Sequence, residues 1–143
     1  MTQLNIVCPH CFVTNRLPEA RLADSPKCGK CHERLFTARP LPVNADQFRK
    51  MVSGNDIPVV VDYWAAWCGP CKMFAPIYEQ AATTLEPHVR LLKLDTETCQ
   101  DIAAQYRIQS IPTLAVFKEG KELTRRSGAM PLGQFLDWIK QVA

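Results

Sequence analysis

Six of the seven cysteines in this chain of 143 residues fall into three Cys-x-x-Cys pairs. The pairs are Cys8/Cys11, Cys28/Cys31 and Cys68/Cys71. Two cysteines at this spacing can bind a metal ion as thiolates, or they can cycle between a dithiol and a disulfide. Because these two chemistries require different surroundings, the residues around each pair indicate which one it carries out.

The third pair stands where a buried strand is expected to be followed by a long helix. Residues 57–65 are a β-branched run typical of a central strand, and residues 68–86 are predicted to form a helix kinked at Pro76. Cys68 would lie at the helix N-terminus, where unpaired N–H groups and the helix dipole stabilise a thiolate. Cys71 follows one turn deeper, so it can attack a mixed disulfide formed by Cys68.

The residues between and before these cysteines suit the same chemistry. Gly69 lets a substrate backbone approach closely. Pro70 lacks an N–H group that the first helical turn would not use. Together with Trp67, which precedes the pair, they favour a redox-active dithiol over a structural one.

The first pair could be interpreted as a second redox site. Its sequence, Cys8-Pro9-His10-Cys11, is similar to the active site of the strongly oxidising periplasmic disulfide oxidases. That interpretation requires a buried strand before the pair and a helix after it. The next residues, FVTNRLPEA, reach Pro18 without a sustained apolar face, and we expect neither element here.

The second pair gives the first a different role. Sixteen residues separate the two pairs, and a Cys-x2-Cys-x16-Cys-x2-Cys spacing is typical of a tetrahedral zinc site. Each pair would form a tight turn whose backbone N–H groups point at the sulfurs, and Pro9 and Gly29 suit such turns. We therefore predict one structural Zn²⁺ bound by four thiolates, those of Cys8, Cys11, Cys28 and Cys31.

Residues 1–38 need a stabilising site of this kind, because they show little helical or strand periodicity. A segment this small cannot bury a core of its own. A structural zinc contributes on the order of 10 kcal/mol to folding. The spacing leaves open that His10 or His32 replaces one ligand, that the four cysteines form two disulfides, or that they make a second redox centre.

The composition argues against several other classes of protein. Apolar residues make up 47% of the chain, which is enough for a packed core, and no run of about 18 apolar residues predicts a membrane span. The N-terminus lacks the features of a secretory signal, so we expect a cytoplasmic protein. The net charge of +3 is concentrated in residues 1–39 and is too small to argue for nucleic-acid binding.

The rest of the chain predicts alternating strands and helices. Residues 38–42 are predicted to form an extended connector, and a helix is expected from the N-cap Asn44 to Gly54. A strand (88–95), a helix (98–106), a hairpin (112–118 and 121–127) and a last helix (132–142) follow. This order predicts an α/β fold with a mixed sheet flanked by helices, residues 39–143, after a small metal-binding domain, residues 1–38.

Residues 39–143 resemble the thioredoxin family. The resemblance rests on Asp62, Trp64, WCGPCK (67–72), Pro76, Lys93, SIPT (110–113), FKEGKE (117–122) and Gly128-Ala129. It implies the thioredoxin fold, a central mixed β-sheet flanked by helices. With the two N-terminal pairs included, the whole chain resembles the bacterial thioredoxin-2 type, in which a zinc-ribbon-like domain precedes the thioredoxin domain.

The resemblance also implies roles for the residues at the dithiol. Cys68 would be the attacking thiolate and Cys71 the resolving thiol. Asp62 would be a buried carboxylate that exchanges a proton with Cys71, because burial raises the pKa of such a group toward neutrality. Lys93 would moderate the charge of Asp62. A hydrogen-bonded core aspartate and a merely exposed lysine remain the alternatives.

A docking surface for substrate is implied in the same way. Pro112 would be a cis-proline that leaves the Ile111 backbone free to pair with an extended substrate segment. The flat apolar surface around Cys68 would consist of four residues: Trp67, Ile111, Gly128 and Ala129. Trp64 would pack under the active-site helix. Cys99 has no counterpart in this scheme, and either an inert buried thiol or a regulatory one is consistent with its position.

These features together predict a cytoplasmic protein-disulfide reductase. Its partners would be disulfide-containing proteins and an NADPH-dependent thioredoxin reductase, with no membrane and no nucleic acid involved. The alternative from another class is a zinc-module adaptor that binds protein or nucleic acid on a thioredoxin scaffold, which would not need an intact dithiol. As a further hypothesis, oxidants could eject the zinc and so change activity or partner choice.

Overall fold

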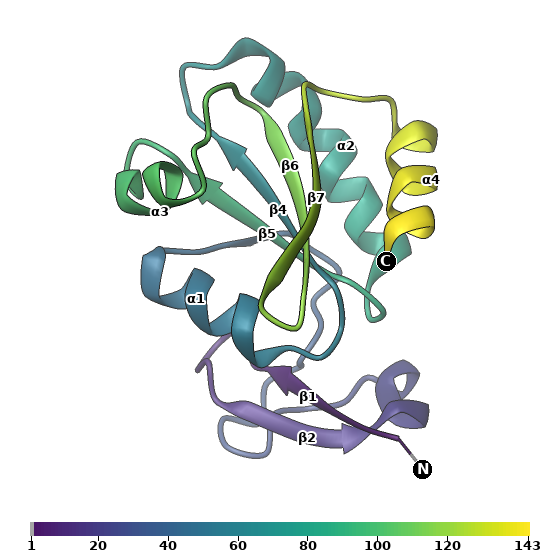
Figure 1. Ribbon diagram of the computed structural model, residues 1–143. Coiled ribbons are helices and arrows are strands. Elements are labelled where there is room, and N and C mark those ends of the chain that lie inside the picture. Colours follow the sequence, from purple (N-terminus) through teal and green to yellow (C-terminus); the bar gives the residue numbers. More distant parts are fainter. Residues whose placement is uncertain (1) are drawn as a thin grey trace.

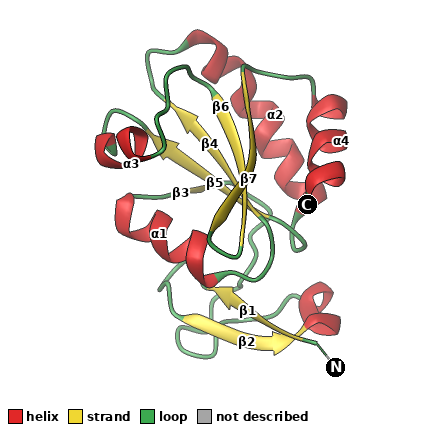
Figure 2. Ribbon diagram, in the orientation of Figure 1, coloured by secondary structure: helices red, strands yellow, loops and turns green. Residues whose placement is uncertain are grey.

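The computed structural model describes residues 2–143 and contains two sheets (Figure 1). The larger sheet has five strands in the order β3-β5-β4-β6-β7, and it is mixed because β4 runs parallel to β5 and antiparallel to β6. Helices α2 and α4 cover one face of this sheet, and α1 and α3 lie on the other (Figure 2). The smaller sheet, β1-β2, belongs to the N-terminal segment, which we define as residues 2–38.

The elements of the large sheet follow the predicted order. The strands are β3 (Leu41–Pro42), β4 (Val59–Trp64), β5 (Arg90–Asp95), β6 (Thr113–Lys118) and β7 (Lys121–Ser127). The helices are α1 (Ala45–Gly54), α2 (Gly69–Leu85), α3 (Gln100–Gln105) and α4 (Leu132–Val142). The predicted strands, helices and hairpin are confirmed, and the connector at 38–42 is in part a strand, since β3 pairs with β5.

Side-chain alternation along β4 places its residues in two separate cores. Val59, Val61 and Tyr63 pack with α1 and α3, whereas Val60 packs with α2 and α4. Asp62 lies two residues from Val60 and therefore shares the face covered by α2. The start of α1 is fixed by the predicted Asn44, whose side chain accepts a hydrogen bond from the Gln47 N–H in a capping box.

The N-terminal segment contains more structure than its sequence indicated. Strands β1 (Gln3–Val7) and β2 (Thr14–Pro18) form an antiparallel pair, followed by the 3₁₀ helix η1 (Glu19–Asp24). The expectation of no strand before Cys8 is therefore wrong, because β1 ends at Val7. The segment also has a small core of its own around Ile6, Leu17, Leu22 and Leu35. Apolar and polar residues alternate too weakly along these short strands for the strands to be recognised in the sequence. In the fold, Cys8 and Cys28 pack in the same cluster as the apolar residues of the strands.

The N-terminal segment packs against the end of the large sheet where β5 begins (Figure 1). Ile57 of the loop before β4 completes its small core. The last residue of α1 must be small here, because a Cβ at Gly54 would lie 2.7 Å from Val7 Cγ2. Within residues 2–143, no helix is both long enough and apolar enough to cross a membrane.

Candidate functional site

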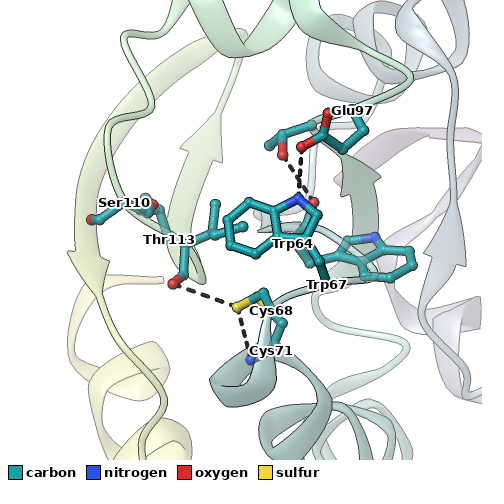
Figure 3. Close-up of a disulfide and its surroundings, with 9 residues drawn as sticks. Trp64, Trp67, Cys68, Cys71, Glu97, Ser110 and Thr113 are labelled. Atoms are coloured by element: carbon teal, nitrogen blue, oxygen red, sulfur yellow. Dashed lines mark hydrogen bonds between the residues drawn. A yellow bond between two sulfur atoms is a disulfide. The ribbon is translucent and has the colours of Figure 1, made fainter.

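The two cysteines of the third pair lie at the junction of β4 and α2 (Figure 3). Cys68 is the N-cap of α2, and Cys71 lies in its first turn. Both side chains are buried, and the two sulfurs form a disulfide. The Cys71 N–H donates to Cys68 Sγ over 3.2 Å, and Cys68 Sγ lies 3.7 Å from the Ile111 carbonyl oxygen. This places Cys68 where the helix dipole and a backbone N–H favour a thiolate.

Asp62 is a buried carboxylate on the face of β4 that α2 covers. Its side chain is 1% exposed, and its Oδ1 has no hydrogen-bond partner among the described residues. Burial raises the pKa of Asp62 from 3.8 to about 7, although the positive charge of Lys93 opposes the shift. An acid with this pKa can accept and return a proton near neutral pH.

Lys93 pairs in register with Asp62 across β5 and β4. Its side chain is partly exposed, and Nζ lies 4.6 Å from the ring centroid of Trp64. A cation in this position interacts favourably with the aromatic face. Lys93 is therefore more constrained than a free surface lysine, and its charge acts on the Asp62 carboxyl.

The residues predicted to dock substrate surround Cys68. The Ile111–Pro112 peptide is cis, as expected, and the Gly128 N–H donates to the Pro112 carbonyl over 2.8 Å. Trp67 is 68% exposed, and with Ile111 it lines a shallow pocket of about 160 Å³. Ala129 follows Gly128 in the loop after β7 and is exposed. Exposed apolar area beside a reactive sulfur suits a protein substrate.

Two hydrogen bonds between polar side chains at this surface were not anticipated. Glu97 Oε1 accepts a hydrogen bond of 2.7 Å from Trp67 Nε1 (Figure 3). The Ser110 hydroxyl donates to the Ser127 hydroxyl over 3.0 Å and so links the loop before Pro112 to the end of β7. No spacing in the sequence indicates either pairing, because the partners are brought together only by the fold.

The four remaining paired cysteines form a compact cluster in the N-terminal segment. Their Sγ atoms all lie within 4.8 Å of one another. The closest contacts join the two pairs, at 3.6 Å for Cys8–Cys31 and 3.7 Å for Cys11–Cys28. Four thiolates at about 2.3 Å from a tetrahedral Zn²⁺ would be separated by about 3.8 Å. The sulfurs therefore fit a zinc ion, and the cluster contains neither His10 nor His32.

The two turns that carry these cysteines have equivalent hydrogen bonds. In the first turn, the His10 N–H donates to Cys8 Sγ over 3.3 Å, and in the second, the Lys30 N–H donates to Cys28 Sγ over 3.4 Å. These bonds match the predicted backbone N–H groups pointing at sulfur. No helix follows Cys11, which distinguishes this pair from Cys68/Cys71.

Asn15 gives the second turn two side-chain hydrogen bonds that have no counterpart in the first turn. Its Nδ2 donates to Cys28 Sγ over 3.5 Å, and its Oδ1 accepts from the Gly29 N–H over 2.8 Å. Asn15 stands four residues after Cys11, where the second turn has the apolar Leu35 four residues after Cys31. An outer residue of this type orients a metal ligand, and nothing in the sequence singled it out.

Cys99, the unpaired seventh cysteine, is remote from both clusters in sequence and is buried. It precedes α3, and its Sγ lies 3.9 Å from the Val43 carbonyl oxygen. Burial in the core beside α1 and α3 is consistent with the inert thiol considered above.

Comparison with known proteins identifies relatives of both parts of the chain. Residues 39–141 match the family model described as Thioredoxin, and residues 7–33 match the one described as Thioredoxin 2, N-terminal. Thioredoxin C-3 of Corynebacterium nephridii is 41% identical over 136 residues, covering 95% of this chain and 93% of that protein. A thioredoxin of Rickettsia felis is 39% identical over 99 residues, covering 69% and 94%.

Solved structures give the same result for the larger sheet. The Malassezia sympodialis thioredoxin superposes with a TM-score of 0.65 at 34% identity, covering 71% of this chain and 90% of that one. A mutant thioredoxin of Halobacterium salinarum superposes with a TM-score of 0.68 at 29% identity, covering 75% and 93%.

Proposed function

The chain belongs to the thioredoxin family, and from this premise we propose how its own residues carry out dithiol–disulfide exchange. Thioredoxins are protein-disulfide reductases, and the Cys68–Cys71 disulfide is the oxidised form of such a site. The observation that supports the assignment of these two cysteines is the place of Cys68 at the N-terminus of α2, after the short loop that follows the buried strand β4.

In the proposed reaction, the Cys68 thiolate attacks one sulfur of a substrate disulfide. A mixed disulfide forms, and the other substrate sulfur leaves as a thiolate. Asp62 takes the proton of Cys71, whose sulfur then attacks Cys68 Sγ. The second substrate thiolate leaves, two electrons have passed to the substrate, and Cys68–Cys71 is a disulfide. The positive charge of Lys93 limits the rise in the pKa of Asp62, so that the carboxyl can still lose its proton near neutral pH.

Substrate binding would use the surface around Cys68. An extended substrate segment would pair with the Ile111 backbone beside Pro112 and lie against Trp67, with Gly69 and Pro70 leaving its backbone room. Gly128 and Ala129 would complete the surface. A thioredoxin reductase using NADPH would return the disulfide to the dithiol, and we place this cycle in the cytoplasm, where such a reductant is available.

The tetracysteine cluster would bind one structural Zn²⁺. Zinc bound there supplies the energy that folds a small segment, and it performs no step of the exchange. Cys8, Cys11, Cys28 and Cys31 would hold it as thiolates, which gives a centre of charge −2. We propose a zinc-binding domain of residues 1–38, of which Met1 lies outside the described residues, and a thioredoxin domain of residues 39–143.

Trapping of the intermediate tests the proposed site. Cys71→Ser should accumulate mixed disulfides with substrate proteins through Cys68, because the resolving thiol is missing. Peptide mapping of the trapped species identifies the sulfur that is used. Adducts through Cys8 or Cys11 would contradict the assignment, and an adaptor without reductase activity would show no turnover of insulin disulfides.

A second function, a redox-responsive zinc site, is favoured by the exposure of Cys11. An exposed zinc-bound thiolate is accessible to peroxide, whereas Cys8 and Cys28 are buried. Native mass spectrometry before and after peroxide, alongside reductase assays, tests this. Zinc that is retained at peroxide levels sufficient to oxidise Cys68 would rule out the response.

A further inference from the structure

Arg90 is a buried charged residue at the contact between the two parts of the chain. It is the first residue of β5, and its side chain is 1% exposed. A buried charge is costly unless it is paired and hydrogen-bonded. The contacts that the Arg90 guanidinium makes therefore indicate its role in the protein.

Most of these partners belong to the N-terminal segment. Arg90 Nη2 donates to the Val7 carbonyl oxygen over 2.9 Å, and its Cζ lies 4.5 Å from the ring centroid of Phe36. Arg90 Nη1 lies 3.8 Å from Glu86 Oε2. Glu86, itself buried, accepts from the Ala38 N–H over 2.9 Å through its other oxygen. The ion pair thus contacts the N-terminal segment at three separate points.

The contact with Val7 bears directly on the metal cluster. Val7 immediately precedes the first ligand, Cys8, which is completely buried. On its other side, the Val7 N–H donates to Asn55 Oδ1 over 2.9 Å. Residues of the thioredoxin domain therefore bind both polar groups of Val7, and the backbone that presents Cys8 is fixed from outside the N-terminal segment.

The charge of Arg90 also suits a neighbouring anionic centre. Burial lowers the pKa of Arg90 to about 10, while Glu86 and Cys8 act in the opposite direction. The guanidinium is therefore still cationic at neutral pH. Four thiolates around one Zn²⁺ would carry a charge of −2, and a buried cation close enough to interact with Cys8 stabilises that charge by attraction.

We propose that Arg90 is a positioning residue of the tetracysteine metal centre, supplied by the thioredoxin domain and oriented by Glu86. It presents Cys8 through the Val7 carbonyl and offsets the charge of the centre. This inference rests on the proposed zinc site. The zinc centre is then incomplete without the thioredoxin domain, and the two domains are linked through one buried side chain.

The rate of zinc release tests the proposal. The double variant Arg90→Met/Glu86→Gln removes both charges, so no unpaired ion is left buried, and glutamine retains the acceptor for the Ala38 N–H. Removal of an outer residue typically weakens metal binding about 10–100-fold. We therefore expect a chelator to extract zinc at least about tenfold faster from this variant than from the wild-type protein.

The matched control is Arg49→Met, which removes an exposed arginine that pairs with Asp101 on the surface. Its zinc release should equal that of the wild-type protein. Equal release from the double variant would overturn the proposal. Should the double variant fail to fold, Arg90→Lys is the test, since lysine retains the charge but lacks the planar fork; wild-type release from a folded Arg90→Lys would then overturn the role of Arg90 in positioning Cys8 through Val7.

A second measurement uses the reciprocity of coupled sites. Zinc removal should lower the thermal midpoint of the thioredoxin domain in the wild-type protein and lower it less in the double variant. If zinc removal lowered the thermal midpoint equally in the wild-type protein and in the double variant, the two domains would not be linked through Arg90. Zinc content of the wild-type protein, measured first by native mass spectrometry, separates the two hypotheses: a protein purified without zinc that binds none on addition refutes the zinc site itself.

Discussion

The Cys8/Cys11 and Cys68/Cys71 pairs begin alike and differ in the element that comes after them. Each pair comes soon after a strand, Cys8 directly after β1 and Cys68 after a short loop that follows β4, and each first sulfur accepts a hydrogen bond from a backbone N–H within its own turn. Cys71 lies in the first turn of α2, a helix of 17 residues, whereas after Cys11 the chain turns back into β2. The spacing of two cysteines therefore defines a local turn, and the next element decides its chemistry.

The buried charge near each pair differs as well. Asp62 lies on the face of β4 that packs against the helix of the redox pair, and it can exchange protons near neutral pH. Arg90, next to the metal pairs, is a cation that does not titrate in this range. An acid suits a thiol that must lose and regain its proton, and a cation suits thiolates that must stay deprotonated.

The largest expected difference between the pairs is in catalysis. Cys68→Ser should reduce the turnover of insulin disulfides to the uncatalysed rate, because Cys68 is the N-cap of α2 and Cys71 serves only to resolve the mixed disulfide. Cys11→Ser should leave turnover within about twofold of wild type, since Cys11 belongs to the tetracysteine cluster and lies away from the dithiol that carries out the exchange. Comparable losses in both variants would mean that the metal pairs take part in the exchange.

Zinc removal should separate the two regions in stability. Chelation should unfold the N-terminal segment, because binding of the metal contributes on the order of 10 kcal/mol there. The Cys68–Cys71 disulfide and the sheet should persist. NMR amide spectra measured before and after chelation report on each region, and retention of the dispersed signals of residues 2–38 would show that their small core suffices.

Asp62 gives a stability that depends on pH. Because its pKa is about 7 in the folded protein against an ordinary 3.8, folding is favoured at low pH and weakens as pH rises from about 4 to 7. Asp62→Asn should therefore stabilise the oxidised protein at pH 8, by on the order of 4 kcal/mol, and have almost no effect at pH 4. Denaturant titrations at both pH values measure this, and a gain independent of pH would contradict it.

The same variant should also slow the exchange reaction. Loss of a general base lowers a rate by on the order of 100-fold, and the loss should affect release of substrate from the mixed disulfide rather than its formation. Rapid-mixing experiments that follow Trp67 and Trp64 fluorescence separate the two steps.

The smallest expected effect concerns Asn15. Asn15→Leu introduces the residue type that the second turn has at the matching position, Leu35, and it removes the hydrogen bonds to Cys28 and Gly29. Zinc release to a chelator should become about 10–100-fold faster. The same change at an exposed amide, Asn44→Leu at the start of α1, should leave zinc release unchanged, and equal effects of both would show that only overall stability matters.

Much of the molecule could be predicted from the sequence where residues near in the chain determine the structure. The start of α1 at Asn44, the place of Cys68 before a helix and the spacing that brings four cysteines into one cluster are local signals. Glu97, Ser127, Asn15 and Arg90 were missed because each finds its partner across the fold. Strand β1 was missed for a different reason: it is short, and its apolar side chains are buried by residues contributed from several turns.

Strand length has a consequence for communication between the two sulfur centres. The dithiol follows the carboxyl end of β4, whereas the N-terminal segment, which holds the tetracysteine cluster, packs beside the opposite end of the sheet, where β5 begins (Figure 1). Six residues of strand extend roughly 20 Å, so the length of the sheet keeps the two reactive sets of sulfur apart. Because thiol–disulfide exchange requires one sulfur to attack another directly, exchange between the two sets would need two molecules to meet.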